Sequence, residues 1–194
     1  MAVDIDGVNS TISTDKLIPQ SGTALQIGES GDTVTLVGSA VGFGGGKIVQ
    51  IVNVENGAVA TGTVAIPMDD TIPQNTEGFE VMTLAITPTS ATNKLLITVT
   101  AWTTDTSGAW CLVALFQDTT ANALATGGRY SSTATAGGMT TFSHYMTSGT
   151  ASETTFKVRV GHKTGGTMTF NGQNSGRMFG GTMVSSITIQ EISV

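Results

Sequence analysis

The sequence predicts an all-β protein, in which an antiparallel β-sandwich or jelly-roll head follows a short extended N-terminal arm with a small β unit. Apolar residues alternate with polar ones at period two in many short segments of the 194 residues. Turn-forming residues separate these segments at intervals of about 10 to 20 residues, and no segment has a helical period. About eight to ten strands in this pattern are typical of a sandwich or jelly roll.

Composition limits the function classes. The net charge is -6 and the eight Lys and Arg residues are scattered, which argues against nucleic-acid binding. The longest apolar run is about seven residues, far below the roughly 20 that a membrane helix needs, so no membrane insertion is expected. Cys111 is the single cysteine, which excludes an intrachain disulfide and a metal site built from cysteines. We expect it to be a small buried side chain.

The first predicted unit, residues 1–47, is an arm that ends in the glycine-rich hinge VGFGGGK. Its polar, acidic start carries apolar residues that could dock on a partner: Val3, Ile5, Val8, Ile12 and Leu17. Two short strands follow at 21–40, too short to be stable alone. Three copies winding together would bury Leu25, Ile27, Val34 and Leu36 along a common axis; the alternative is an isolated hairpin packed on the main domain.

The second predicted unit, residues 48–194, is the head. Its expected strands, in order, are 48–54, 58–66, 79–87, 94–102, 110–116, 121–126, 139–146, 155–160, 167–170 and 183–192. Glu55-Asn56-Gly57 predicts a hairpin between the first two. Turn formers at 103–108 predict a second, central hairpin that spans 94–117.

The return strand of that central hairpin is apolar on both faces. Trp110, Leu112, Ala114 and Phe116 alternate with Cys111, Val113 and Leu115. Both faces of such a strand must be covered. The second sheet of the sandwich can cover one face, and the other needs a cover from outside the sandwich, most simply a neighbouring subunit. The pattern therefore predicts an oligomer in which Cys111, Val113 and Leu115, or the opposite face of the strand, form the subunit contact.

Two short stretches could carry chemistry or recognition. Asp69 and Asp70 belong to an acidic segment with Glu77 and Glu80, which could be a solvated loop, a cation site or a glycosidase pair. Arg129 and Tyr130, in the predicted loop GGRYSS, are residue types that interfaces favour. The two histidines match no catalytic motif, and His162 is expected to be exposed. No catalytic residue, cofactor or metal is expected.

Four phrases resemble tail-fibre or virion structural proteins of tailed bacteriophages, a group common in aquatic phages. They are DDTIPQNTEG at 69–78, ITPTSATNKLLI at 86–97, VALFQDTTANALA at 113–125 and RMFGGTMVSSITIQEI at 177–192. The resemblance covers about residue 47 to the end, and LQIGESGDTVTLVG at 25–38 is similar to the short β units that precede such heads. It implies a homotrimeric appendage of the virion, assembled in the host cytoplasm. It brings no catalytic motif with it.

The sequence thus predicts a short trimeric fibre or knob on the tail or head of the particle. Its arm would attach through Val3, Ile5, Val8, Ile12 and Leu17 to capsid or tail proteins. Its head would present Arg129, Tyr130, Asp69 and Asp70 as candidate contacts to a host surface glycan or receptor. The alternatives are a capsid decoration protein without receptor binding and, less favoured, a polysaccharide-degrading enzyme.

Overall fold

The computed structural model describes residues 46–194. The predicted arm lies outside the described residues, together with nearly all of its hinge. The candidate residues that fall there are Val3, Ile5, Val8, Ile12, Leu17, Leu25, Ile27, Val34 and Leu36.

The described chain is all-β apart from one short 3-10 turn. The strands are β1 (Ile48–Asn56), β2 (Ala60–Gly62), β3 (Phe79–Ile86), β4 (Lys94–Asp105), β5 (Trp110–Gln117), β6 (Ala125–Tyr130), β7 (Gly138–Thr147), β8 (Thr154–His162), β9 (Met168–Phe170), β10 (Gly172–Gln173), β11 (Gly176–Arg177) and β12 (Ser185–Ile192), with the 3-10 turn η1 (Phe179–Gly181) before the last strand.

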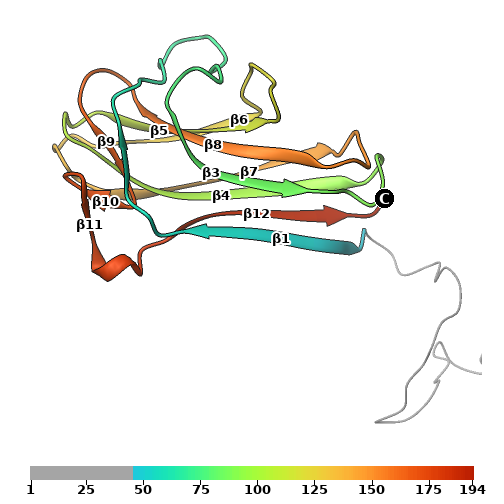
Figure 1. Cartoon of the computed structure of the whole chain (residues 1–194). Helices are drawn as coiled ribbons and strands as arrows, with labels where there is room; N and C mark the ends of the chain where they lie inside the picture. Colours follow the sequence, from blue (N-terminus) through green and yellow to red (C-terminus); the bar gives the residue numbers. More distant parts are fainter. Residues whose placement is uncertain (1–45) are drawn as a thin grey trace, which may run out of the picture. The chain divides into compact units, whose positions relative to one another are not determined.

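Two antiparallel sheets form a sandwich of jelly-roll type, which confirms the predicted fold class. Sheet A has the order β1-β12-β4-β9-β2, with β7 also paired to β4; sheet B has the order β3-β8-β5-β6. The chain repeatedly crosses between the sheets, as it does from β3 to β4 and from β4 to β5. In Figure 1, β1, β12 and β4 lie in the lower part of the head, and β5, β6 and β8 lie in the upper part.

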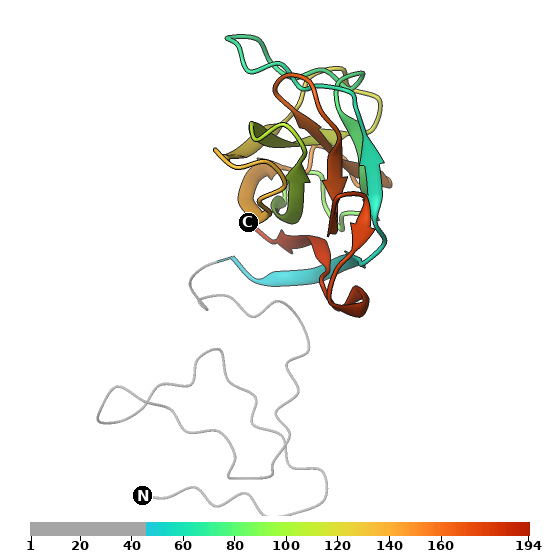
Figure 2. The ribbon, with the colours of Figure 1, turned by 90° about the vertical axis from the view of Figure 1, so that its left-hand side faces the viewer.

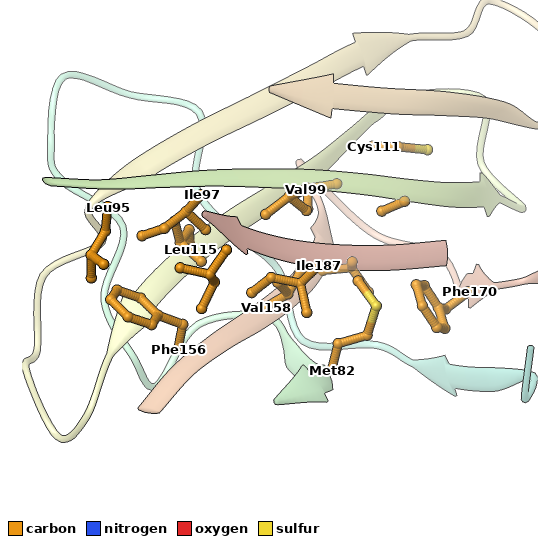
Figure 3. Close-up of a cluster of buried hydrophobic side chains, with 14 of the residues drawn as sticks. Met82, Leu95, Ile97, Val99, Cys111, Leu115, Phe156, Val158, Phe170 and Ile187 are labelled. Carbon is orange, nitrogen blue, oxygen red and sulfur yellow. The ribbon is translucent and has the colours of Figure 1, made fainter. Parts of the chain in front are cut away.

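The hydrophobic core lies between these sheets because their strands alternate as the sequence pattern requires. Leu95, Ile97 and Val99 of β4 are fully buried and belong to one cluster with Phe156 of β8 and Leu115 of β5, as Figure 3 shows. Each buried side chain of this size contributes about 1.5–3 kcal/mol. The core therefore fixes the sandwich that carries the surfaces described below.

Neither predicted hairpin forms. β1 pairs with β12 and β2 pairs with β9, so the Glu55-Asn56-Gly57 turn joins strands with different partners. β4 and β5 belong to different sheets, so 103–108 is a crossover between the layers. In both cases long-range burial outweighs local turn propensity, because β-strand pairing is governed by packing.

Strand β6 begins later than predicted and takes in most of the expected loop GGRYSS. Its glycines permit close packing on both faces. A Cβ at Gly127 would lie 2.6 Å from the Phe142 ring, and one at Gly128 would lie 2.6 Å from the Leu112 side chain. Arg129 and Tyr130 are therefore strand residues with fixed directions.

Candidate functional site

The doubly apolar strand β5 receives both of its covers from its own chain. One face lies in the core between the sheets, and the other packs against Ile66, which is fully buried. Cys111, Val113 and Leu115 are each 0% exposed. The prediction that these three side chains contact a neighbouring subunit is wrong, because the fold leaves none of their surface free. The opposite face, at Leu112, Ala114 and Phe116, is buried as well.

The cover over β5 is the segment between β2 and β3. Its central residue, Ile66, was predicted to end the strand 58–66, but β2 stops at Gly62. In Figures 1 and 2 the segment lies on the side of the head opposite β1. Ile66 donates its backbone N–H to the His162 carbonyl at 3.0 Å. Arg159 donates from Nε to the Glu77 carbonyl at 2.7 Å and from Nη2 to the Gly78 carbonyl at 2.8 Å. These bonds hold the segment on sheet B.

The outward surface of sheet A is different, and we call it the open face. It consists of side chains that β7, β4, β12 and β1 direct away from the core. The strand registers align them in rows: Tyr145–Leu96–Gln190–Ile51, then Ser143–Thr98–Thr188–Asn53, then Thr141–Thr100–Ser186–Glu55, with Met139 and Trp102 beyond. Ile51 and Tyr145 are each 57% exposed and Met139 is 46% exposed. None of the described residues covers them.

Hydroxyl groups and a lack of charge characterise the centre of the open face. Thr98 and Ser143 share a hydrogen bond of 3.0 Å, and the amide of Asn53 donates to the Thr188 hydroxyl at 2.8 Å. The charged side chains that β1, β4, β7 and β12 place there are Lys94, at one end of β4, and Glu55, on the edge strand β1. A flat surface with exposed apolar side chains and few charges is typical of a protein interface.

Of the predicted host contacts, Arg129 is not available. Its Nη2 group donates to the Thr103 carbonyl at 2.8 Å and to the Ala136 carbonyl at 2.6 Å, and it lies 3.9 Å from the Cys111 sulfur. Arg129 points inward on β6 and ties sheet B to β4. The prediction that it contacts a host surface disagrees with this placement, since the side chain points into the head and its Nη2 group donates to two backbone carbonyls there.

Tyr130 is 59% exposed on the outward side of β6. Its ring lies 5.7 Å from the ring of Trp110, at a tilt of 49°. Trp110 and Tyr130 thus form an aromatic pair on the outer side of sheet B, in which Tyr130 is exposed and Trp110 is half-buried.

The two predicted acids Asp69 and Asp70 are exposed in the segment that covers β5. Asp69 Oδ1 accepts hydrogen bonds from the Thr71 backbone N–H at 2.9 Å and from its hydroxyl at 2.5 Å, and these bonds lower the pKa of Asp69 below its usual value. Asp69 also borders a shallow hollow of about 230 Å³ next to Leu112 and Thr126. Within residues 46–194, no three His, Cys, Asp or Glu side chains are grouped so as to hold a metal ion.

Glu191 was not predicted as a special residue, although alternation on β12 places it inward after Ile187 and Ile189. Its carboxylate is 0% exposed. It accepts hydrogen bonds from Gln50 Nε2 at 2.6 Å, from Asn93 Nδ2 at 2.5 Å, and from the N–H and hydroxyl of Thr89 at 2.8 Å each. Desolvation raises the pKa of Glu191, but these bonds outweigh it and hold the pKa at about 2.

Two side chains of catalytic type are buried at one end of the core. Burial raises the pKa of the Cys111 thiol, and the nearby Arg129 only partly opposes this. The thiol is therefore neutral at physiological pH and has no path to a substrate. His162 is 2% exposed and its Nε2 lies 3.0 Å from the Thr63 carbonyl oxygen, so the expectation that it is exposed is wrong. None of the described residues forms a helix long and apolar enough to span a membrane.

Two solved structures show a distant likeness to this fold. No family model and no curated protein matches this chain. Eiger TNF from S. frugiperda superposes with a TM-score of 0.46 at 9% sequence identity, covering 74% of this chain and 93% of that one. The C-terminal domain of EclA, a sugar-binding protein, superposes with a TM-score of 0.32 at 18% identity, covering 77% of this chain and 88% of that one. Likenesses this distant carry no argument about what this chain binds or assembles with.

Proposed function

We propose that this chain is the subunit of a homotrimeric structural appendage of a tailed-phage virion. Its N-terminal residues attach to capsid or tail proteins, and its β-sandwich head is presented outward for adhesion to a host surface. The sequence resemblance to virion structural proteins supports the assignment to a phage. The role is mechanical and adhesive rather than catalytic.

The open face of sheet A is the observation that carries the proposal. Each chain has a net charge of -6, so copies repel one another except where charged side chains are few. The open face offers such a place: Ile51 and Tyr145 can be buried against a second copy, while the rows of Thr and Ser can form hydrogen bonds across the contact. We therefore propose the open face, instead of strand β5, as the contact between subunits.

A trimer would present three identical heads on one attachment point. Weak sites on the three heads then act together, because binding of the first raises the effective concentration of the others. Tyr130 with Trp110, and Asp69 with Asp70, remain the candidate host contacts among the residues first predicted. Tyr130 and Trp110 lie on β6 and β5 of sheet B, and Asp69 and Asp70 lie in the segment that covers β5. None of the four belongs to the open face of sheet A, so a trimer built on that face would leave them accessible.

Attachment is tested by particle assembly with full-length chain and with chain lacking residues 1–19. We expect the full-length chain in purified particles and the truncated chain only in the unbound fraction. Incorporation of the truncated chain at the full-length level would contradict the proposed anchor.

Adhesion is tested separately, by binding of the purified head, residues 46–194, to cells of permissive hosts. Binding supports the adhesive role. If the full-length chain incorporates into particles but the purified head binds no permissive host cell, the decoration function is supported instead.

A further inference from the structure

A second hollow lies on the outer side of sheet B and is lined by four charged side chains. Its volume is about 260 Å³. Lys157 and Arg159, which follow each other on the outward side of β8, lie beside Glu80 of β3 and Asp118 after β5. Asn75 and Thr119 complete its polar lining, and the Phe116 side chain forms its floor. We call this hollow the β8 pocket.

The fold holds the frame of the β8 pocket in place. Asp118 Oδ2 accepts from the Thr154 hydroxyl at 2.9 Å and its Oδ1 accepts from the Thr155 N–H at 2.8 Å. Glu80 Oε1 accepts from the Thr83 hydroxyl at 2.7 Å. Arg159 has already donated from Nε and Nη2 to backbone carbonyls, and its Nη1 lies 3.9 Å from Glu80 Oε2. Such preorganisation reduces the entropy lost when a ligand binds.

Several hydrogen-bonding groups in the β8 pocket have no partner among the described residues. The Lys157 ammonium and the Thr119 hydroxyl form no hydrogen bond or ion pair there. Asn75 uses its amide nitrogen to bind the carbonyls of Thr119 and Thr120, which leaves its Oδ1 available. The pocket thus presents free donors and free acceptors within a single small volume.

The charges of the β8 pocket select the ligand class. Two bases and two acids sum to zero, so an anion would meet Glu80 and Asp118 and a cation would meet Lys157 and Arg159. An apolar ligand would leave these polar groups unpaired. A neutral ligand whose hydroxyl groups donate and accept at once satisfies both kinds of group. The volume is below the roughly 300–1,000 Å³ of sites for drug-sized ligands, which suits a single sugar ring.

We propose that the β8 pocket binds one ring of a neutral saccharide, with Lys157 and Thr119 donating to ring hydroxyls and Asp118, Glu80 and Asn75 Oδ1 accepting from them. The inference rests on the proposed adhesive function and gives it a site other than the residues first predicted. The sequence contained a signal for it, because Lys157 and Arg159 alternate outward with the buried Phe156, Val158 and Val160.

Saturation-transfer difference NMR on the full-length protein tests this site with glucose, galactose, mannose and N-acetylglucosamine, each alone. We expect transfer to the ring protons of at least one sugar, at a millimolar dissociation constant. Lys157→Met and Thr119→Val should each weaken that binding by tenfold or more, because each removes one donor and keeps the side-chain volume. Lys163→Met, which removes an exposed lysine in the turn after β8, should leave it unchanged.

Two results would refute binding at this pocket: no saturation transfer to any of the four sugars, or saturation transfer that persists unchanged in both pocket variants. A third result, tighter binding of galacturonate than of galactose, would overturn the inference by assigning the pocket to anions. The solution mass of the same samples distinguishes failure of the saccharide proposal from failure of the proposed function. A trimer without sugar binding refutes the pocket alone, and a monomer that binds sugar refutes the trimeric appendage alone.

Discussion

Glu191 links three parts of the head, and its removal has a calculable effect. The carboxylate binds Gln50 of β1 and both Thr89 and Asn93 in the connection between β3 and β4. Its pKa falls from 4.5 to about 2 on folding. Because one pKa unit corresponds to about 1.4 kcal/mol, the ionised carboxylate stabilises the fold by roughly 3 kcal/mol at neutral pH.

The sign of the pH dependence follows from the lowered pKa. The stabilisation is complete above pH 4.5, where the carboxyl is ionised in both the folded and unfolded chain, and it is lost as the pH falls from 4.5 towards 2. Glu191→Gln should therefore lower the free energy of unfolding by roughly 3 kcal/mol at pH 7. The new amide NH₂ also faces the amide groups of Gln50 and Asn93, so two donors oppose each other.

Urea unfolding at fixed protein concentration, followed by tryptophan fluorescence, measures this effect at pH 7, 5, 3.5 and 2.5. The deficit of Glu191→Gln should shrink steadily below pH 4.5. Glu153→Gln, which alters an exposed carboxylate, is the matched control and should differ from the native chain by less than about 0.5 kcal/mol. A Glu191→Gln deficit below about 0.5 kcal/mol at pH 7, or one that stays constant down to pH 2.5, would refute the reasoning.

Two further predictions concern the covers of β5. Ile66→Ala should lower the free energy of unfolding by about 2–5 kcal/mol, because Ile66 is fully buried against Leu112, Ala114 and Phe116. The control is Ile72→Ala, at an exposed site in the same segment. Equal effects of the two substitutions in urea unfolding would contradict the assignment of Ile66 as the cover of β5. The Cys111 thiol should resist a thiol-specific reagent at pH 8 in the folded protein, because it is buried and its pKa is raised, and it should react fully in denaturant. Reaction of the folded protein at the rate of a free cysteine would show instead that β5 is accessible.

Strand periodicity predicted the fold class because alternation is set by which side of a sheet faces the core. On β4, Leu95, Ile97, Val99 and Ala101 lie inward as their spacing required. Pairing partners were not predictable in the same way. The Glu55-Asn56-Gly57 turn has good hairpin chemistry, yet β1 pairs with β12, which is nearly the whole head away in sequence. A turn motif reports only local preference, whereas the partner of β1 depends on where Val52 and Val54 can be buried.

The surface residues were predicted less well, because direction depends on neighbours that sequence separates. Arg129 has the composition of a contact residue, but its position on the inward side of β6 uses its donors within the fold. Tyr130, one residue later, points outward. The doubly apolar β5 correctly indicated two covers, but the second is Ile66 of the same chain. The charge-poor surface that supports an oligomer lies on the other sheet, where Thr and Ser alternate with core residues and gave no apolar signal.

Solution mass is the most direct test of the trimer proposal. We would measure the full-length protein and Thr98→Arg by light scattering on a sizing column, with Thr126→Arg, an exposed threonine on β6 of sheet B, as the matched control. The subunit mass is 19.8 kDa, so the native chain and the control should elute with three times that mass. Thr98→Arg should shift towards the monomer, because it places a desolvated charge in the open face. A monomeric native chain, or a trimer that Thr98→Arg leaves intact, would contradict assembly through this face.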